Sequence, residues 1–284
     1  MIPGGMLGPV GGLEQVWFTS KESMSKGPRF VTRTALSGRS HAQVLPRQAR
    51  AWECEIPYDA PQEGQILDQL ETWVARQREP LVWYPADALG TNMLDPAASQ
   101  MDMDWWEDAE PGGARLLPGE GLPGPRFLSS ASTSPTGKWA HLSDVPVPHN
   151  VELTASVYVT PYLGQAAHFW VDELRMDGST HTVHKANTVV ANATNAAAST
   201  LHRLSHTITT TGETAAITFG VSRASAVVAP ALTLTDHVRE WGIGRGCMSA
   251  LVDVTGRSPL WTATNQHIYG AADATSFTIT ELIA

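Results

Sequence analysis

The segment VELTASVYVT, residues 151–160, alternates apolar and polar side chains over its whole length and is the strongest constraint on the fold. Successive side chains of a β-strand point to opposite sides, so this period of two predicts a strand with one buried face. The buried face would hold Val151, Leu153, Ala155, Val157 and Val159. The other face would hold Glu152, Thr154, Ser156, Tyr158 and Thr160.

Short segments rich in Val, Thr and aromatic residues extend this pattern through the second half of the chain, with turn residues between them at fairly even spacing. They are residues 127–130, 139–142, 167–174, 180–184, 201–210, 215–222, 229–235, 251–254 and 277–283. Only 17% of the residues are charged, which favours strands and turns over long surface helices. We therefore predict an antiparallel β-sandwich, or jelly roll, over residues 125–284.

The first part of the chain predicts a strand, a helix and a second strand. Trp52, Cys54 and Ile56 alternate with two glutamates, as in a half-buried strand. Apolar residues then recur at three- and four-residue spacing, which predicts a helix over about residues 62–78. Residues 81–84 are strand formers, so the helix would pack on a sheet that contains both flanking strands.

The expected fold class is therefore mainly β, with two domains. A small β domain with one helix would occupy residues 1–96, and residues 97–124, which are acidic and then rich in Pro and Gly, would connect it to the sandwich. The first twelve residues are rich in Gly and Pro, so we expect an arm or edge segment there that packs on a neighbouring subunit through Met1, Leu7 and Val10.

Several motifs of the chain resemble a known family. They are "SSAS…GKW", "VPVPHNVELTASVYVTP", "AAITFGVSRA…APALTLTD" and "WGIGRGCMSALVDV", and the resemblance covers about residues 50–282. The chain is similar to minor tail proteins of siphophages that infect actinobacteria. In that family a domain like the core of distal tail proteins precedes a sandwich that resembles carbohydrate-binding modules.

The resemblance implies a structural role in a phage tail tip or baseplate. The N-terminal domain would form a ring with copies of itself or join other tail proteins, and the sandwich would project outward. The protein would be made in the host cytoplasm and reside in the virion. An alternative is a module that binds a host cell-wall glycan, and a second alternative is a carbohydrate-active enzyme.

Composition argues against other partners. The net charge is −9 and no basic run appears, which disfavours nucleic acid. No stretch of eighteen apolar residues predicts a membrane span. Cys54 and Cys247 lie far apart in the sequence, and we expect buried free thiols.

Residues that could support catalysis or bind a metal have simpler explanations. Asp102, Asp104 and Asp108 form an acidic cluster that could hold Ca²⁺, but a solvated loop is the commoner outcome. The pairs His181 with His184 and His202 with His206 cannot chelate a metal unaided in a strand. The glycines of residues 242–246 precede a strand and not a helix, so they predict a turn beside the buried Cys247 and no phosphate site. We expect no enzyme and no cofactor.

Aromatic residues are the better indication of binding. Sugar-binding sandwiches stack aromatic rings on the apolar faces of pyranoses. Trp105 and Trp106 are adjacent, so at least one ring would be exposed or packed on another subunit, and Tyr158 lies on the polar face of its strand. These three are the candidate glycan-binding residues, whereas Trp139 and Trp170 would fill the sandwich core.

Overall fold

The computed structural model describes most of the chain. The described residues are 4–16, 23–27, 30–34, 40–44, 48–56, 80–102, 104–108, 115–118, 123–129, 138–141, 144–161, 166–190, 201–222, 224–264 and 267–282, with single helical positions at 69, 72, 73 and 75. All strand pairings with a described register are antiparallel, and the predicted fold class, mainly β with a β-sandwich, is confirmed. None of the described helices is long and apolar enough to cross a membrane.

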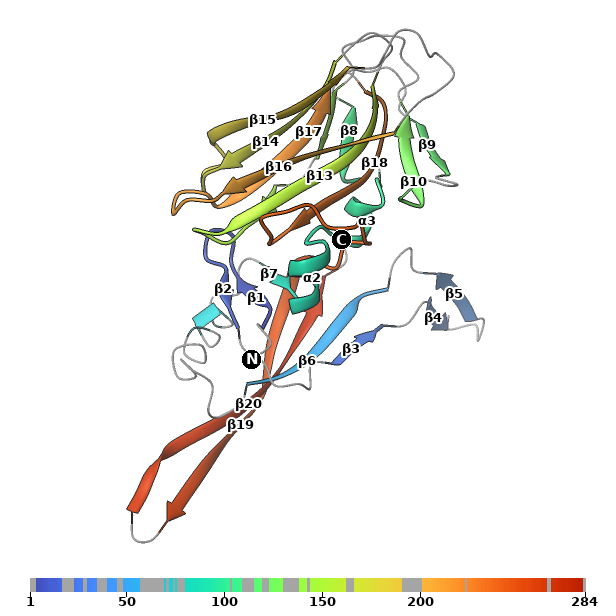
Figure 1. The fold of residues 1–284 in the computed structure, drawn as a ribbon. Coiled ribbons are helices and arrows are strands. Elements are labelled where there is room, and N and C mark those ends of the chain that lie inside the picture. Colours follow the sequence, from blue (N-terminus) through green and yellow to red (C-terminus); the bar gives the residue numbers. More distant parts are fainter. Residues whose placement is uncertain are drawn as a thin grey trace. The chain divides into compact units, whose positions relative to one another are not determined.

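Two antiparallel sheets form the sandwich (Figure 1). The five-stranded sheet has the order β16 (His202–Thr209), β13 (Glu152–Pro161), β18 (Ala224–Thr233), β10 (Arg126–Ser129) and β9 (Arg115–Pro118). The six-stranded sheet has the order β15 (Thr180–Val190), β14 (Ala166–Leu174), β17 (Ala216–Ser222), β11 (Lys138–His141) and β8 (Trp106–Asp108), with β12 (Val145–Pro146) on β17. The chain passes back and forth between the sheets from β15 to β18, as expected for a jelly roll.

The core of the sandwich lies between the inner faces of these sheets. The predicted inner face of β13 is confirmed, because Leu153, Ala155, Val157 and Val159 are all buried, although Val151 just before the strand is only half-buried. Phe219 of β17 forms edge-to-face ring pairs with Phe169 at 6.0 Å and Trp106 at 5.6 Å between centroids. Burial of such large rings supplies much of the stability of a core.

Two short helices follow β7 and pack at β18. They are α2 (Ala86–Thr91) and α3 (Pro96–Ser99), and Asp95 caps α3 by accepting a hydrogen bond from Ala97 N at 2.8 Å. Between them, the buried side chain of Asn92 donates to Pro230 O at 3.1 Å and accepts from Leu232 N at 3.1 Å. This amide therefore ties the inter-helix segment to β18.

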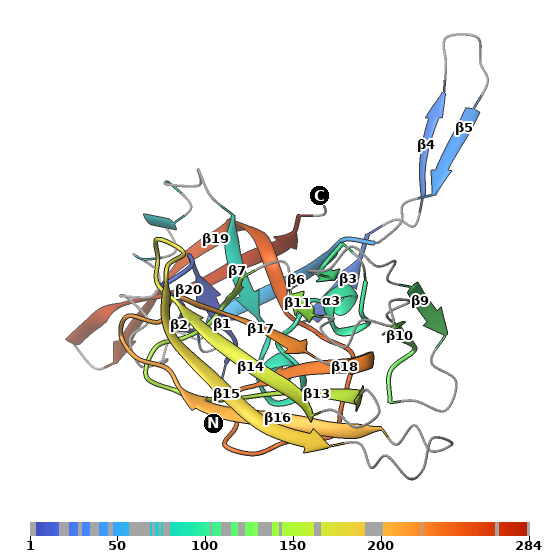
Figure 2. The same ribbon diagram turned by 90° about the horizontal axis from the view of Figure 1, so that it is seen from above.

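A seven-stranded sheet makes up the other part of the fold. Its order is β2 (Glu14–Gln15), β1 (Met6–Gly8), β7 (Leu81–Tyr84), β19 (Cys247–Thr264), β20 (His267–Glu281), β6 (Arg50–Ile56) and β3 (Ser23–Lys26). The strands predicted on both sides of the helix, β6 and β7, do lie in one sheet, with β19 and β20 between them. The strands β4 (Phe30–Thr34) and β5 (Ser40–Val44) pair only with each other among the described strands (Figure 2).

A buried ion pair joins two strands of this sheet. Arg50 of β6 donates from Nε and Nη2 to the two carboxylate oxygens of Glu281 of β20, at 2.9 and 2.7 Å. The backbone N of Arg50 donates to the same carboxylate at 3.0 Å, and the Arg50 guanidinium lies over the ring of Trp52. The charge of each side chain is thus compensated inside the sheet.

The N-terminal part contains the predicted helix and the predicted arm. Most of the helix predicted over residues 62–78 lies outside the described residues, and Gln69, Thr72, Trp73 and Ala75 within it are helical. Of the expected arm, Leu7 is fully buried in β1 of the chain's own sheet, Val10 is 40% exposed, and Met1 is outside the described residues. Leu7 therefore cannot serve a neighbouring subunit, because its own chain already buries it.

The chain divides into two compact units that differ from the predicted domains. One unit comprises residues 1–9, 15–83 and 249–284, and the other comprises residues 10–14 and 84–248. The last 36 or so residues, expected to complete the sandwich, instead supply β19 and β20 to the sheet that contains β6. Alternation shows which face of a strand is buried, but it does not show which strands are neighbours.

Candidate functional site

The outer face of the six-stranded sheet presents a tryptophan beside a carboxylate. Phe169 and Val171 of β14 are fully buried in the core, so Trp170 and Asp172 lie on the opposite face of the sheet. Residues two apart in a strand are separated by roughly 7 Å, so ring and carboxylate are near neighbours. Across the ladder, Trp170 pairs with Gly220 and Asp172 pairs with Thr218 of β17.

Neither side chain makes a hydrogen bond or a ring contact within the described part of the chain. Trp170 is half-buried and makes no described hydrogen bond or ring contact. Oδ1 of Asp172 is closed to solvent and has no hydrogen-bond donor among the described residues. Burial raises the pKa of this carboxyl group, and the nearby His184 opposes part of the rise. An acceptor without a donor beside an unstacked ring is suited to a ligand that supplies hydroxyl groups and an apolar face.

The outer face of the five-stranded sheet carries a second cluster, formed by Tyr158, Arg203 and Ser156. Tyr158 of β13 and Arg203 of β16 are directly opposite each other, and the guanidinium carbon lies 5.1 Å from the centre of the tyrosine ring. Nη2 of Arg203 donates to Ser156 Oγ at 2.9 Å. Nε of Arg203 is buried and has no acceptor among the described residues. Both Tyr158 and Arg203 are half-buried.

A polar network runs between the edges of the two sheets. His184 of β15 contacts Glu173 Oε1 through Nε2 at 2.6 Å, and Thr214 Oγ1 donates to the other oxygen of the same buried carboxylate. The ring of His184 lies 5.3 Å from that of His206 of β16, which belongs to the opposite sheet. Glu173 thus holds His184 through one oxygen and Thr214 through the other. Because His184 also contacts His206, the cluster links the edge strands β15 and β16.

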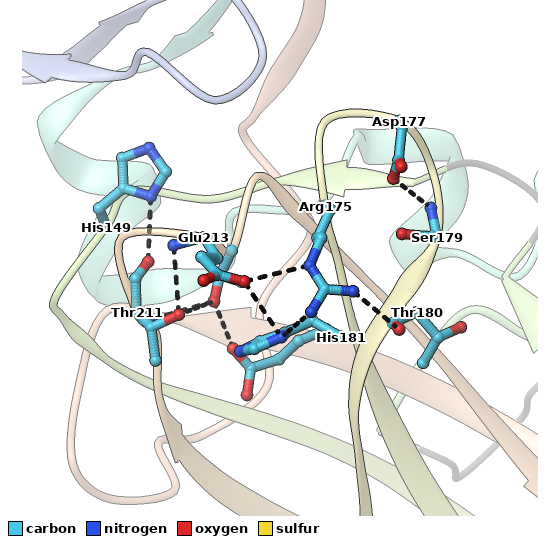
Figure 3. A network of polar contacts seen from close by, with 10 residues as sticks. His149, Arg175, Asp177, Ser179, Thr180, His181, Thr211 and Glu213 are labelled. Atoms are coloured by element: carbon cyan, nitrogen blue, oxygen red, sulfur yellow. Dashed lines mark hydrogen bonds and ion pairs between the residues drawn. The ribbon is translucent and has the colours of Figure 1, made fainter.

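The network continues to the surface through the turns that precede β15 and β17 (Figure 3). Arg175 donates from Nε to Glu213 at 3.1 Å and contacts His181 Nδ1 through Nη2 at 2.8 Å. Thr211 Oγ1 lies 3.2 Å from Thr214 Oγ1, which links this surface group to Glu173. Figure 3 shows the side chains of Arg175, Glu213 and His181 pointing toward one another.

The structure does not bring the predicted glycan-binding residues together. Trp106 is 1% exposed, and its Nε1 donates to Ala98 O at 2.8 Å, so its ring belongs to the core and offers no face to a ligand. Trp105 is half-buried at the turn before β8. Tyr158 lies in the other sheet, on the expected polar face, with one side of its ring beneath Arg203.

The acidic cluster shows a turn. Asp102 Oδ1 accepts from Asp104 N at 3.2 Å, and the side chain of Asp108 is outside the described residues. No group of three or more histidine, cysteine or acidic side chains that could hold a metal is found among the described residues. Cys54 and Cys247 are buried free thiols, as predicted.

The glycine-rich segment 242–246 makes a close backbone contact. Gly246 N donates to Leu94 O at 3.1 Å, and Gly244 N donates to Ser99 Oγ at 2.7 Å. A Cβ on Gly246 would lie 1.9 Å from Met93 O. The glycines therefore serve packing against the segment between α2 and α3.

The prediction that Trp170 fills the sandwich core was wrong, because Trp170 is half-buried on the face opposite Phe169, and Asp172 and Arg203 were not predicted. The side chain of Trp139, the other predicted core tryptophan, lies outside the described residues. The sequence contained a signal for Trp170 and Asp172. The segment AAHFWVDEL of β14 alternates, and this alternation places Trp170 with the polar residues and not with Phe169. A tryptophan on the polar face of a half-buried strand indicates a surface role more than a core role. Arg203 has no comparable signal in the sequence.

No protein family and no curated protein matches this sequence. Among solved structures, the xylan-binding domain CBM22-1 of Xyn10C from Paenibacillus barcinonensis is similar over 52% of this chain and 97% of its own length, at 12% identity and a TM-score of 0.39. TmCBM61, solved with β-1,4-galactotriose, covers 51% of this chain and 100% of its own, at 10% identity and a TM-score of 0.35. The enzymatically active domain of tailspike protein 4 from bacteriophage CBA120 is similar over 51% of this chain and 21% of its own, at 9% identity and a TM-score of 0.39. Similarity at this level assigns no function.

Proposed function

We propose that the protein binds carbohydrate through the outer face of its six-stranded sheet, at Trp170 and Asp172. The observation that supports this most directly is the half-buried Asp172 carboxylate, whose Oδ1 has no hydrogen-bond donor among the described residues, on the same strand face as the half-buried ring of Trp170. Desolvating a carboxylate without a hydrogen bond costs free energy, so a folded protein keeps such a group where a ligand or water completes it.

Pyranose rings fit this arrangement chemically. The C–H groups on one face of the sugar would stack on the Trp170 indole, and its hydroxyl groups would donate to Asp172. Gly220, directly across the ladder from Trp170, has no side chain and is buried, so the indole has no side-chain neighbour at that position of β17. Thr218 and Ser222 of β17 flank Gly220 on the same face and would supply further hydroxyl contacts.

Binding without catalysis is the simpler form of this proposal. Glycoside hydrolysis needs two carboxylates on either side of one bond. Asp172 and Glu173 are adjacent in β14, so they point to opposite sides of the sheet, and Glu173 is engaged by His184 and Thr214. This pair of carboxylates therefore cannot act on one substrate.

The test is a binding screen with a matched pair of variants. Isothermal titration against soluble neutral polysaccharides should give binding by the parent protein and a loss of at least tenfold in Trp170→Ala, since aromatic stacking dominates such sites. Trp241→Phe is the control, because Trp241 is also half-buried in this unit but its Nε1 donates to Pro230 O. Equal affinity of Trp170→Ala and the parent would refute the proposal.

A second candidate function is assembly within a phage tail. It is favoured by the two-stranded extension of β19 and β20 in the unit that contains the seven-stranded sheet. Beyond the residues of β20 that pair with β6, β19 and β20 continue as a ladder of their own from Ser258 with Ala274 to Thr264 with His267 (Figure 1). An isolated two-stranded ribbon is marginally stable in water, so a protein partner that packs on it would stabilise it.

The partners under this second candidate are further copies of the chain in a ring and other tail proteins, and the location is the virion tail tip. Solution mass and electron microscopy of the purified protein test it. A ring that is lost when residues 258–273 are replaced by a two-residue turn would support assembly. A monomer both alone and when mixed with tail proteins would count against it.

A further inference from the structure

We propose that the outer face of the five-stranded sheet carries a second and separate site, at Arg203 and Tyr158, that binds a carboxylate-bearing sugar. This site lies on the opposite sheet from Trp170. It can therefore be tested independently of the proposed site at Trp170 and Asp172.

Arg203 is a half-buried cation for which the described residues provide no anion. The other described arginines that are buried or half-buried have carboxylate partners, since Arg50 pairs with Glu281 and Arg175 pairs with Glu213. Among the described residues, Arg203 contacts the hydroxyl of Ser156 and both the ring and the side-chain oxygen of Tyr158, but no carboxylate, and its Nε has no acceptor there. A ligand carboxylate would take the position that Glu281 and Glu213 take for the other two arginines.

The electrostatics agree with this geometry. Burial lowers the pKa of the guanidinium, which means that the charged form is desolvated without full compensation. A ligand carboxylate would provide the missing compensation, and the planar guanidinium can hold it through two parallel hydrogen bonds. The contact with the Tyr158 ring and the hydrogen bond to Ser156 restrict the Arg203 side chain, so less side-chain entropy remains to be lost on binding.

The surroundings of Arg203 suit a sugar better than a simple anion. Along the same face, the cross-strand pairs after Tyr158 and Arg203 are Ser156 with Ser205 and Thr154 with Thr207. Ser205 is half-buried and Thr207 is exposed, so the hydroxyl groups of β16 line the face beside the guanidinium, whereas Ser156 and Thr154 of β13 are buried. The nearest acidic residue of β13 is Glu152, six residues from Tyr158 and thus roughly 20 Å away along the strand. No carboxylate of β13 therefore competes with the ligand.

The experiment is a titration of the full chain with trigalacturonate, with galactotriose as its neutral counterpart. We expect trigalacturonate to bind, and we expect Arg203→Gln to weaken it at least tenfold. Arg203→Lys keeps the charge but loses the planar fork, so it should retain only part of the affinity. Arg126→Gln removes an exposed arginine of β10 in the same sheet and should leave trigalacturonate binding unchanged. Thermal melts of each variant check that it folds.

Three results would overturn the proposal. Trigalacturonate binding that survives in Arg203→Gln would remove the arginine from the site. Trigalacturonate binding lost in Trp170→Ala but kept in Arg203→Gln would place the acidic sugar on the other face. Acetate or inorganic phosphate binding at Arg203 as tightly as trigalacturonate would show a simple anion site without sugar recognition.

Discussion

His206 makes the sandwich sensitive to acid at the scale of single residues. Burial and the nearby His184 lower the pKa of His206 in the folded protein. The unfolded chain therefore takes up a proton more readily than the folded chain, and stability is lost as the pH falls below about 6.5, the ordinary histidine value. Urea unfolding at pH 7.5 and 5.5 should show lower stability at the acidic pH, and His206→Asn should reduce the difference. An unchanged difference in the variant would exclude His206 as its source.

Asp172 should affect stability and binding in opposite directions. Burial raises the pKa of its carboxyl group, so the ionised form is disfavoured in the folded protein at neutral pH. We expect Asp172→Asn to raise the melting temperature at pH 7 and to weaken carbohydrate binding, as is common where a binding site keeps a strained group.

The control for this prediction is Asp177→Asn. Asp177 Oδ1 accepts from Ser179 N at 2.9 Å in an exposed turn, and these hydrogen bonds lower the pKa of Asp177. Asp177→Asn should lower the melting temperature slightly and leave carbohydrate binding intact. If Asp172→Asn behaved in the same way, Asp172 would be an ordinary surface acid.

These residues also show which features of the site could be predicted from the sequence. The alternation of β13 correctly predicted its buried side chains, because that property depends only on the strand's own period. That Arg203 Nε and Asp172 Oδ1 find no hydrogen-bond partner among the described residues depends on strands dozens of residues away in the sequence, such as β16 opposite β13. A pattern within one strand contains no information on that pairing, so the sequence pointed to Tyr158 but not to Arg203.

At the scale of elements, the fit between residues 242–246 and the segment after α2 depends on glycine. Gly246→Ala would force its Cβ against Met93 O, a backbone atom that cannot move aside alone. We expect a loss of about 2–3 kcal/mol in the free energy of unfolding, typical of overpacking a close contact. Gly212→Ala is the control, since nothing lies within 4 Å of a Cβ there. Equal losses in both variants would show that glycine flexibility, not the contact, matters.

The ion pair between β6 and β20 should contribute far more to the free energy of unfolding than a surface ion pair does. Glu281→Gln leaves Arg50 buried without its counter-charge, and breaking a buried pair costs about 3–5 kcal/mol. Asp87→Asn breaks the exposed pair with Arg245 and should cost about 0–1 kcal/mol. Urea unfolding followed in the seven-stranded sheet measures both, and similar small values would mean that water reaches Arg50.

At the scale of the whole molecule, the path of the chain makes its two ends interdependent. Sequence patterns assigned residues 50–56 and 277–283 to different domains, yet β6 and β20 are neighbours in one sheet. Local spacing cannot reveal this, because the contact joins segments more than two hundred residues apart, and the intervening sandwich is inserted between them.

Removal of residues 249–284 should therefore unfold the N-terminal part while the sandwich remains. The deletion takes β19 and β20 out of the middle of the sheet, so β6 and β7 lose the strands that separate and bury them. In hydrogen exchange, amides of β6 and β7 should lose protection, whereas those of β13 and β14 should keep it. The control replaces only residues 258–273 by a two-residue turn, which spares the pairs from Thr275 with Ile56 to Thr280 with Ala51. Loss of protection throughout the sandwich in the longer deletion would show instead that the two units fold as one.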